Sequence, residues 1–275
     1  MLTDRQIEAY RRDGYLVIPR LIEGEQLALL RALTDRIVAE AGSIAQSDEL
    51  YDLEASHSAA LPRVRRLKPA IFKRYTFFHG LVRDPKITTI LAQLLGPNIR
   101  QHGGKLNMKS AGYGSPVEWH QDWAFYPHTN DDVLATGIYL DDCDQDNGPL
   151  MVLPGSHLGP THDHHADGRF CGAMDPQACG LDFAKAVPLM GPAGSMTIHH
   201  ARLVHGSALN RSNRQRRLLL HEYAAADAWP LLGVANFDEF NGRMVLGEPT
   251  IEPRVVAAPI RMPLPPADHQ GSIYE

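Results

Sequence analysis

The two stretches that decide the fold of this chain read Trp119-His120-Gln121-Asp122 and His205-Gly206-Ser207. Two imidazoles and one carboxylate form the ligand set that holds Fe(II) on one side and leaves the other side open. Residues two apart in a strand point to the same face, so His120 and Asp122 can reach one ion while Gln121 points away. His205 must then come from a distant strand that the fold brings alongside.

The sequence around these stretches is typical of many short strands. Beyond about residue 98, β-like runs are separated by Gly, Pro, Asn and Asp, which favour turns. The runs are Leu106–Lys109, Val133–Leu140, Pro149–Leu153, Ser195–Ile198 and Arg217–Tyr223. This texture indicates a sandwich or barrel, and the jelly roll is the version that closes around a site. We therefore predict a mainly β fold with helices, built on a double-stranded β-helix (cupin-like jelly roll).

The first 98 residues have helical signals instead. Thr3 is a suitable N-cap and Gly14 a stop for a first helix, and a brief strand follows at 15–18. Apolar residues at helical spacing predict a second helix around 27–38, and a third runs from Asp84-Pro85 to Gly96. Residues 42–66 lack periodicity and predict a loop. We expect one domain over 1–275: a helical layer (1–98), a jelly-roll core (99–225) and a C-terminal extension (226–275).

Composition and charge indicate which classes of molecule the protein binds. The 275 residues are 44% hydrophobic and carry a formal net charge of −5 without long runs of one sign, which favours a small-molecule substrate over nucleic acid. No apolar run approaches the roughly 20 residues of a membrane span. Three cysteines without paired spacing and an opening Met1–Arg5 unlike a leader peptide predict a cytoplasmic protein that does not bind a membrane. The sequence makes no prediction about oligomeric state.

Arg216, eleven residues after His205, strengthens the iron hypothesis. A lone His-x-Asp pair arises by chance in many chains, and this one has 14 histidines. Arg216 could also be one of several surface charges, together with Arg211, Arg214 and Arg217. The apolar run 218–220 that follows favours a buried arginine, whose planar fork can bind a carboxylate in a bidentate manner.

Taken together, these motifs resemble the phytanoyl-CoA dioxygenase family of Fe(II)/2-oxoglutarate oxygenases, which is related to ectoine hydroxylase. The resemblance covers nearly the whole chain, from 13–19 and 95–98 through the metal-ligand stretch. It includes Asp146-Asn147-Gly148-Pro149-Leu150, Leu153-Pro154-Gly155-Ser156-His157, and His205-Gly206-Ser207 with Arg216.

The resemblance implies a role for each matching residue. It implies that His120, Asp122 and His205 bind the iron and that Arg216 holds the distal carboxylate of 2-oxoglutarate. Ser207, two residues beyond a ligand, would supply a second hydrogen bond to that carboxylate. Further cosubstrate contacts are implied for Lys68 and Asn107, although an exposed lysine is the ordinary interpretation of Lys68 in the run 65–68.

The implied activity is that of an Fe(II)/2-oxoglutarate-dependent dioxygenase. It would use O₂ to hydroxylate an unactivated C–H bond of a small-molecule metabolite, with release of succinate and CO₂. The same iron chemistry could instead serve desaturation, epoxidation or rearrangement. A catalytically silent jelly-roll sensor or scaffold that binds metal is the alternative from another class. The sequence has no dedicated basic patch for a CoA phosphate, which favours a free metabolite.

Several other features have more than one interpretation. The histidine-rich segment 162–165 follows Pro160, and we interpret it as a lid or substrate-facing loop, not as a second metal site. His199 and His200 are expected to pack or to support the metal ligands by hydrogen bonds. The aromatic residues of 123–126 fit either a substrate-pocket wall or core filling.

Overall fold

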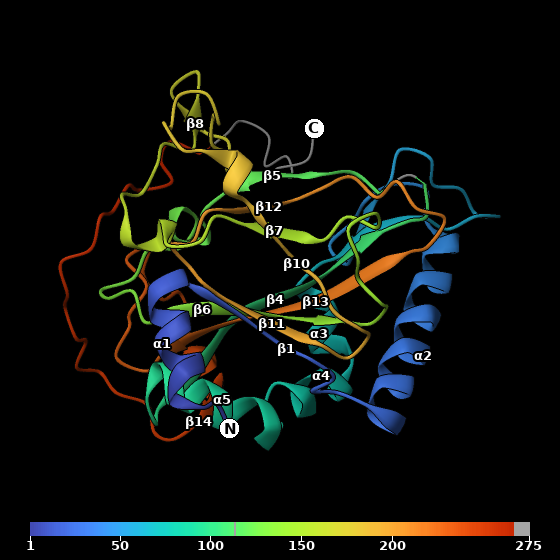
Figure 1. The fold of residues 1–275 in the computed structure, drawn as a ribbon. Helices are drawn as coiled ribbons and strands as arrows, with labels where there is room; N and C mark the ends of the chain where they lie inside the picture. Colours follow the sequence, from blue (N-terminus) through green and yellow to red (C-terminus); the bar gives the residue numbers. More distant parts are fainter. Residues whose placement is uncertain (113, 267–275) are drawn as a thin grey trace.

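In the computed structural model, which describes residues 1–112 and 114–266, two antiparallel sheets face each other (Figure 1). The larger sheet has eight strands in the order β1-β11-β6-β13-β4-β3-β2, and β14 also pairs with β4. Its strands are β1 (Tyr15–Ile18), β2 (Tyr51–Leu53), β3 (Val64–Leu67), β4 (Ile99–Lys109), β6 (Val133–Tyr139), β11 (Met196–His200), β13 (Arg216–Ala225) and β14 (Met244–Leu246).

The smaller sheet supplies the strands that carry two of the predicted metal ligands. It has the order β10-β7-β12-β5, formed by β5 (Val117–His120), β7 (Leu150–Val152), β10 (Val187–Leu189) and β12 (His205–Ser207). A separate hairpin, β8 (His165–Ala166) with β9 (Arg169–Phe170), lies above this sheet in Figure 1. The prediction of a mainly β jelly roll is confirmed, and the five predicted strands correspond to parts of β4, β6, β7, β11 and β13.

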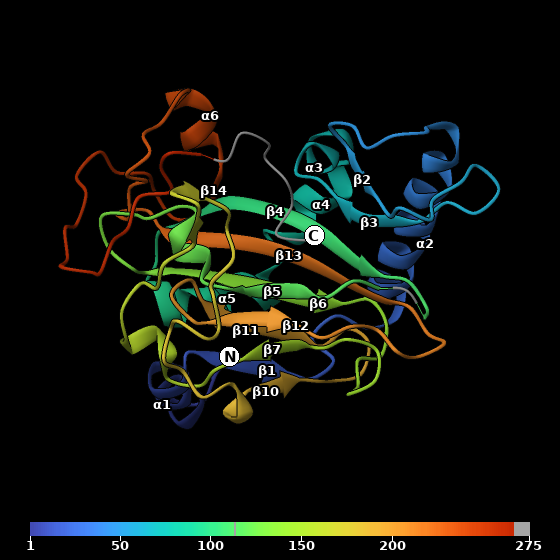
Figure 2. The ribbon, with the colours of Figure 1, turned by 90° about the horizontal axis from the view of Figure 1, so that it is seen from above.

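The face of the larger sheet that points away from the smaller sheet is covered by helices (Figures 1 and 2). α3 (Ala70–Arg74), α4 (Thr76–Leu81) and α5 (Pro85–Leu95) lie against this face, and α1 (Asp4–Asp13) and α2 (Gly24–Glu40) lie towards its two ends. α6 (Phe237–Gly242) belongs to the C-terminal part and lies near β14. Alternate residues of the strands, such as Leu106 and Leu219, join the largest buried apolar cluster with Ile87 and Leu91 of α5. The opposite face of these strands is thereby left to line the space between the sheets.

The helix ends follow the local signals in the sequence. The Thr3 hydroxyl accepts a hydrogen bond from the Gln6 amide, and Gly14 ends α1 in the left-handed conformation at φ 82°. Asp84 caps α5 through the Lys86 amide, with Pro85 in the first turn and Gly96 at the end. These residues satisfy backbone groups that a helix leaves unpaired at its ends.

The predicted loop over 42–66 is wrong in part. Tyr51–Leu53 and Val64–Leu67 form β2 and β3, which extend the larger sheet beyond β4. Three- and four-residue strands are too short to show a hydrophobic period. They are extended because β2 pairs with β3 and β3 pairs with β4. The N-terminal 98 residues therefore contribute three strands to the sheet as well as helices.

The C-terminal part wraps over one end of the sandwich. Residues 247–266 have no regular strand or helix apart from an isolated bridge at Pro266. The carbonyl of Pro259 accepts hydrogen bonds from the Trp123 indole at 2.9 Å and from the Thr161 hydroxyl at 2.5 Å. Within the described residues, none of the helices combines the length and apolar character needed to cross a membrane.

Candidate metal centre

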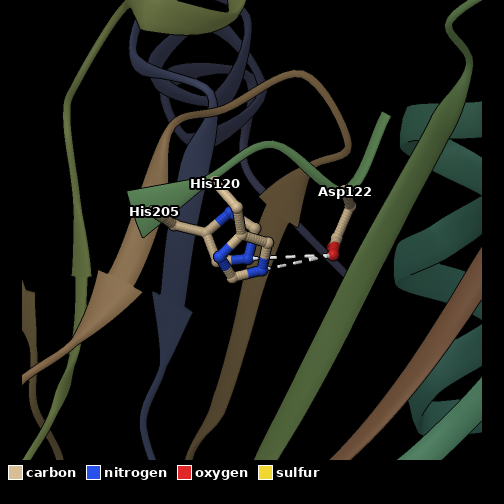
Figure 3. A group of neighbouring side chains, drawn as sticks. All are labelled: His120, Asp122 and His205. Atoms are coloured by element: carbon tan, nitrogen blue, oxygen red, sulfur yellow. Dashed lines mark ion pairs between the residues drawn. The ribbon is translucent and has the colours of Figure 1, made fainter. Parts of the chain in front are cut away.

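Three side chains, two from neighbouring strands and one from the turn that follows β5, converge between the sheets (Figure 3). Register pairs His205 of β12 directly with His120 of β5, and their ring centroids are 4.1 Å apart. Asp122 follows in the short 3₁₀ turn Asp122–Ala124, and its Oδ1 lies 3.7 Å from Nε2 of His120 and 3.9 Å from Nε2 of His205. In the described part of the chain, no other three acidic, histidine or cysteine side chains approach this closely.

Gln121 points away from this group, as the strand alternation predicts. Its side-chain amide donates to the carbonyls of Pro160 and Arg202, at 3.1 and 2.7 Å, and its carbonyl oxygen accepts from the amide of His162. Its own amide donates to Nε2 of His164. These bonds tie the 160–164 loop to the strand end, so Gln121 fixes the backbone between the two ligands.

The hydrogen bonds of the two histidines set which nitrogen can bind a metal. Nδ1 of His120 lies 2.8 Å from the carbonyl oxygen of Glu118, and Nδ1 of His205 lies 2.9 Å from that of Leu203. A carbonyl oxygen can only accept, so Nδ1 carries the proton in each ring. The lone pair is therefore on Nε2, the atom that faces Asp122.

His199, on β11, supports the carboxylate. Its Nε2 lies 3.3 Å from Oδ2 of Asp122, which leaves Oδ1 directed to the two histidine ligands. A hydrogen bond to the second oxygen of a ligating carboxylate orients the first. His200, the next residue, lies on the other side of the strand, where its Nε2 is 4.0 Å from Oδ2 of Asp131.

Burial sets the protonation states that metal binding needs. Burial lowers the pKa of His120 to about 4 and holds the pKa of His205 well below its usual value. Burial opposes ionisation of Asp122, but His205 and the hydrogen bond from His199 outweigh it, so the pKa of this carboxyl is well below normal. Neutral imidazoles beside an ionised carboxylate are the ligand forms for a divalent metal.

The cavity at the metal-ligand group extends to three polar atoms without partners. Nε and Nη2 of Arg216 both donate to the carbonyl of Gly148, at 3.0 and 2.7 Å, whereas its Nη1 has no partner. The Ser207 hydroxyl and Oδ1 of Asn107 are also buried without a partner, and all three residues line the cavity. Since unpaired buried polar groups are costly, a cation and a hydroxyl of this kind fit a ligand carboxylate.

Lys68 lies elsewhere. Its ammonium group donates to the carbonyl of Asp48 at 2.8 Å, and it is not among the residues that line the cavity. Arg66, two residues earlier on β3, lines it and pairs in register with Asn107. Lys105 and Glu222 also line the cavity and were not predicted. Strand alternation from Asn107 could have identified Lys105, whereas nothing local identified Glu222.

The aromatic residues after Asp122 lie in two different surroundings. Trp123 is fully buried in an apolar cluster. Phe125 has its ring 5.9 Å from that of His120, edge to face, and with Tyr126 it lines a second cavity of about 410 Å³. The 162–165 segment is held in place by the bond from the Gln121 backbone amide to Nε2 of His164 and by the contact of His165 Nε2 with the carbonyl oxygen of Leu264 at 3.2 Å.

The chain matches the family model described as phytanoyl-CoA dioxygenase (PhyH) over residues 10–218. A probable alpha-ketoglutarate-dependent hypophosphite dioxygenase of Stutzerimonas stutzeri is 40% identical over 280 residues, which cover 100% of this chain and 96% of that protein. An L-proline trans-4-hydroxylase of Streptomyces griseoviridis is 32% identical, covering 78% and 83%.

Solved structures share the fold. EctD from S. alaskensis with bound Fe has a TM-score of 0.69 and 22% identity, covering 90% of this chain and 80% of that one. The structure of EctD with 2-oxoglutarate and 5-hydroxyectoine has a TM-score of 0.66 and 24% identity, covering 82% and 77%. This chain therefore shares its fold with these structures.

Proposed function

The chain belongs to the phytanoyl-CoA dioxygenase family, and from this premise we propose that it hydroxylates a small charged metabolite. It is an Fe(II)- and 2-oxoglutarate-dependent dioxygenase, as its relatives are. The observation that carries the proposal is the convergence of three ligand atoms beside a buried arginine with an unpaired Nη1. A silent metal-binding protein would not need both features.

Each residue of the centre has a proposed task. Nε2 of His120, Nε2 of His205 and Oδ1 of Asp122 would bind Fe(II) on one face, and His199 would hold Asp122 in place through its second oxygen. With iron and 2-oxoglutarate bound, one oxygen atom of O₂ enters the cosubstrate, which leaves as succinate and CO₂, and the other enters the substrate.

We assign the distal carboxylate of 2-oxoglutarate to Arg216 and Ser207. Nη1 of the arginine and the serine hydroxyl are both buried and lack partners, and β13 and β12 bring them to the same cavity. Asn107 supplies a further polar contact from β4. Lys68 is excluded from this proposal because its ammonium group already binds the Asp48 carbonyl outside the cavity.

The substrate is proposed to carry an oxyanion group. Hypophosphite is an oxyanion and proline carries a carboxylate, and these molecules give two of the relatives their names. The hydrogens of hypophosphite are bound to phosphorus, so the oxidised bond is a C–H or a P–H bond. A cytoplasmic location is part of the proposal, because Cys143, Cys171 and Cys179 are all free thiols.

Release of succinate from 2-oxoglutarate tests the activity. The purified protein, stripped of metal and reloaded with Fe(II), is expected to release succinate in the presence of O₂, and the rate should rise with hypophosphite, L-proline or ectoine when one of them is a substrate. Omission of Fe(II) and the His205→Ala variant are the controls. Equal succinate release with and without Fe(II) would refute the proposal.

A further inference from the structure

An ion pair faces the metal ligands from the larger sheet. Nζ of Lys105 on β4 lies 3.4 Å from Oε1 of Glu222 on β13, with 27% and 11% of the two side chains exposed. Both residues line the cavity that contains His120 and Asp122, and the ammonium of Lys105 helps to lower the pKa of Asp122. The pair therefore lies across the cavity space from the metal position.

Packing does not account for this pair. Three neighbouring strand residues, Ala135, Leu218 and Leu220, line the same cavity with apolar side chains. Taking two charges out of water costs free energy that their mutual attraction often fails to return, so an apolar pair would serve the fold as well or better. Two charged residues in this position therefore indicate a role in binding.

The backbone is adapted to hold the carboxylate. Gly103 is opposite Glu222 in the register of β4 and β13, and a Cβ at position 103 would lie 2.3 Å from Oε2 of Glu222. Glycine in the interior of a strand weakens it and often marks a close approach by another group. A side chain at position 103 would therefore displace the carboxylate of Glu222 from its present place.

The charged groups of Lys105 and Glu222 are also farther apart than in a direct hydrogen bond. A direct charged hydrogen bond spans about 2.7–2.9 Å. Arg217, also on β13, meets this length, because its Nη2 lies 2.7 Å from Oδ1 of Asp141. The 3.4 Å between Nζ and Oε1 leaves both groups able to accept a new partner. A simple anion that captured Lys105 would leave Glu222 buried and unpaired, which is costly. A molecule with both charges would satisfy both residues.

Building on the proposed function, we propose that Lys105 and Glu222 recognise the primary substrate and that this substrate is a small zwitterion. Its oxyanion group binds the ammonium of Lys105, and its cationic group binds the carboxylate of Glu222. Because both residues lie in the cavity of His120 and Asp122, the bond to be oxidised is held beside the metal. The oxyanion is a carboxylate or a phosphorus oxyanion, two sources with the same recognition chemistry.

Equilibrium binding, without turnover, tests this inference. The protein is loaded with Mn(II) and 2-oxoglutarate without O₂, and calorimetry first establishes that 2-oxoglutarate binds; if it does not, the proposed function fails. L-proline, β-alanine and aminomethylphosphonate are then compared with cyclopentanecarboxylate, propionate and methylphosphonate, which lack the cationic nitrogen. We expect at least one zwitterion to bind about 10-fold more tightly than its partner, equivalent to one favourable charged contact.

Variants separate the two recognition residues. Lys105→Met should weaken zwitterion binding by about 10-fold or more, with Lys105→Arg restoring part of it, and Glu222→Gln should abolish the preference over the partner lacking nitrogen. Lys185→Met removes the same charge from a side chain that is 79% exposed and should bind as the parent does. The proposal is overturned if no zwitterion outbinds its partner, or if the preference survives in Glu222→Gln.

Discussion

Arg216→Leu is the sharpest test of the cosubstrate assignment. Arg216 is 2% exposed, and its Nε and Nη2 both donate to the Gly148 carbonyl, so Nη1 is the donor left for 2-oxoglutarate. A hydrogen bond to a charged group contributes about 1.5–3 kcal/mol. Its loss should raise the dissociation constant of 2-oxoglutarate by about 10- to 150-fold while Ser207 keeps its contact. Iron binding should change little, because Arg216 is not a ligand.

The measurement is a calorimetric titration of Mn(II)-loaded protein with 2-oxoglutarate in the absence of O₂. Arg216→Leu also removes two hydrogen bonds from Gly148 and should lower the free energy of unfolding by about 1–3 kcal/mol, so urea unfolding must show that the variant is folded at the assay temperature. Arg214→Leu is the matched control, because this arginine is 49% exposed and pairs with Asp144 at the surface. A 2-oxoglutarate affinity within twofold of the parent in a folded Arg216→Leu would remove the arginine from the site.

Three further predictions concern the ligands and the fold. His205→Ala should abolish tight Fe(II) binding and succinate release together, and retention of either, by metal analysis or by succinate assay, would exclude His205 as a ligand. Gly194→Ala should lower the free energy of unfolding, measured in urea, by about 2 kcal/mol or more. The reason is that φ of Gly194 is +81° and the new Cβ would lie 1.8 Å from the carbonyl oxygen of Ile22. An unchanged urea midpoint would contradict this packing. Burial lowers the pKa of His221 from 6.5 to about 3, so this imidazole binds a proton more tightly in the unfolded chain than in the folded one. The free energy of unfolding should therefore fall as the pH drops from about 6.5 towards 3, by up to about 1.4 kcal/mol per pH unit from this group. His221→Gln should flatten that dependence, and an unaltered slope would show that the imidazole is not buried as a neutral group.

The local sequence was sufficient to predict a structural feature wherever that feature depends on residues close together in the chain. The spacing of His120 and Asp122, the Thr3 and Asp84 caps and the Gly14 stop each depend on neighbours within about one turn or one strand. The strand of Arg216 was predicted for the same reason, since an apolar run follows it. Short elements such as β2 and β3 were missed because pairing with another strand, not their own residues, makes them extended.

By itself, the sequence determined the chemistry of the metal ligands and the kind of fold that can bring them together. Tertiary structure alone decided which polar residues share their cavity. His199 and His200 are identical neighbours on β11, yet only His199 reaches Asp122, because the sheet sets which face of the strand points inward. Lys105 meets Glu222 through the register of two strands more than a hundred residues apart in sequence. Such a register is fixed by the packing of whole sheets, which no local pattern encodes.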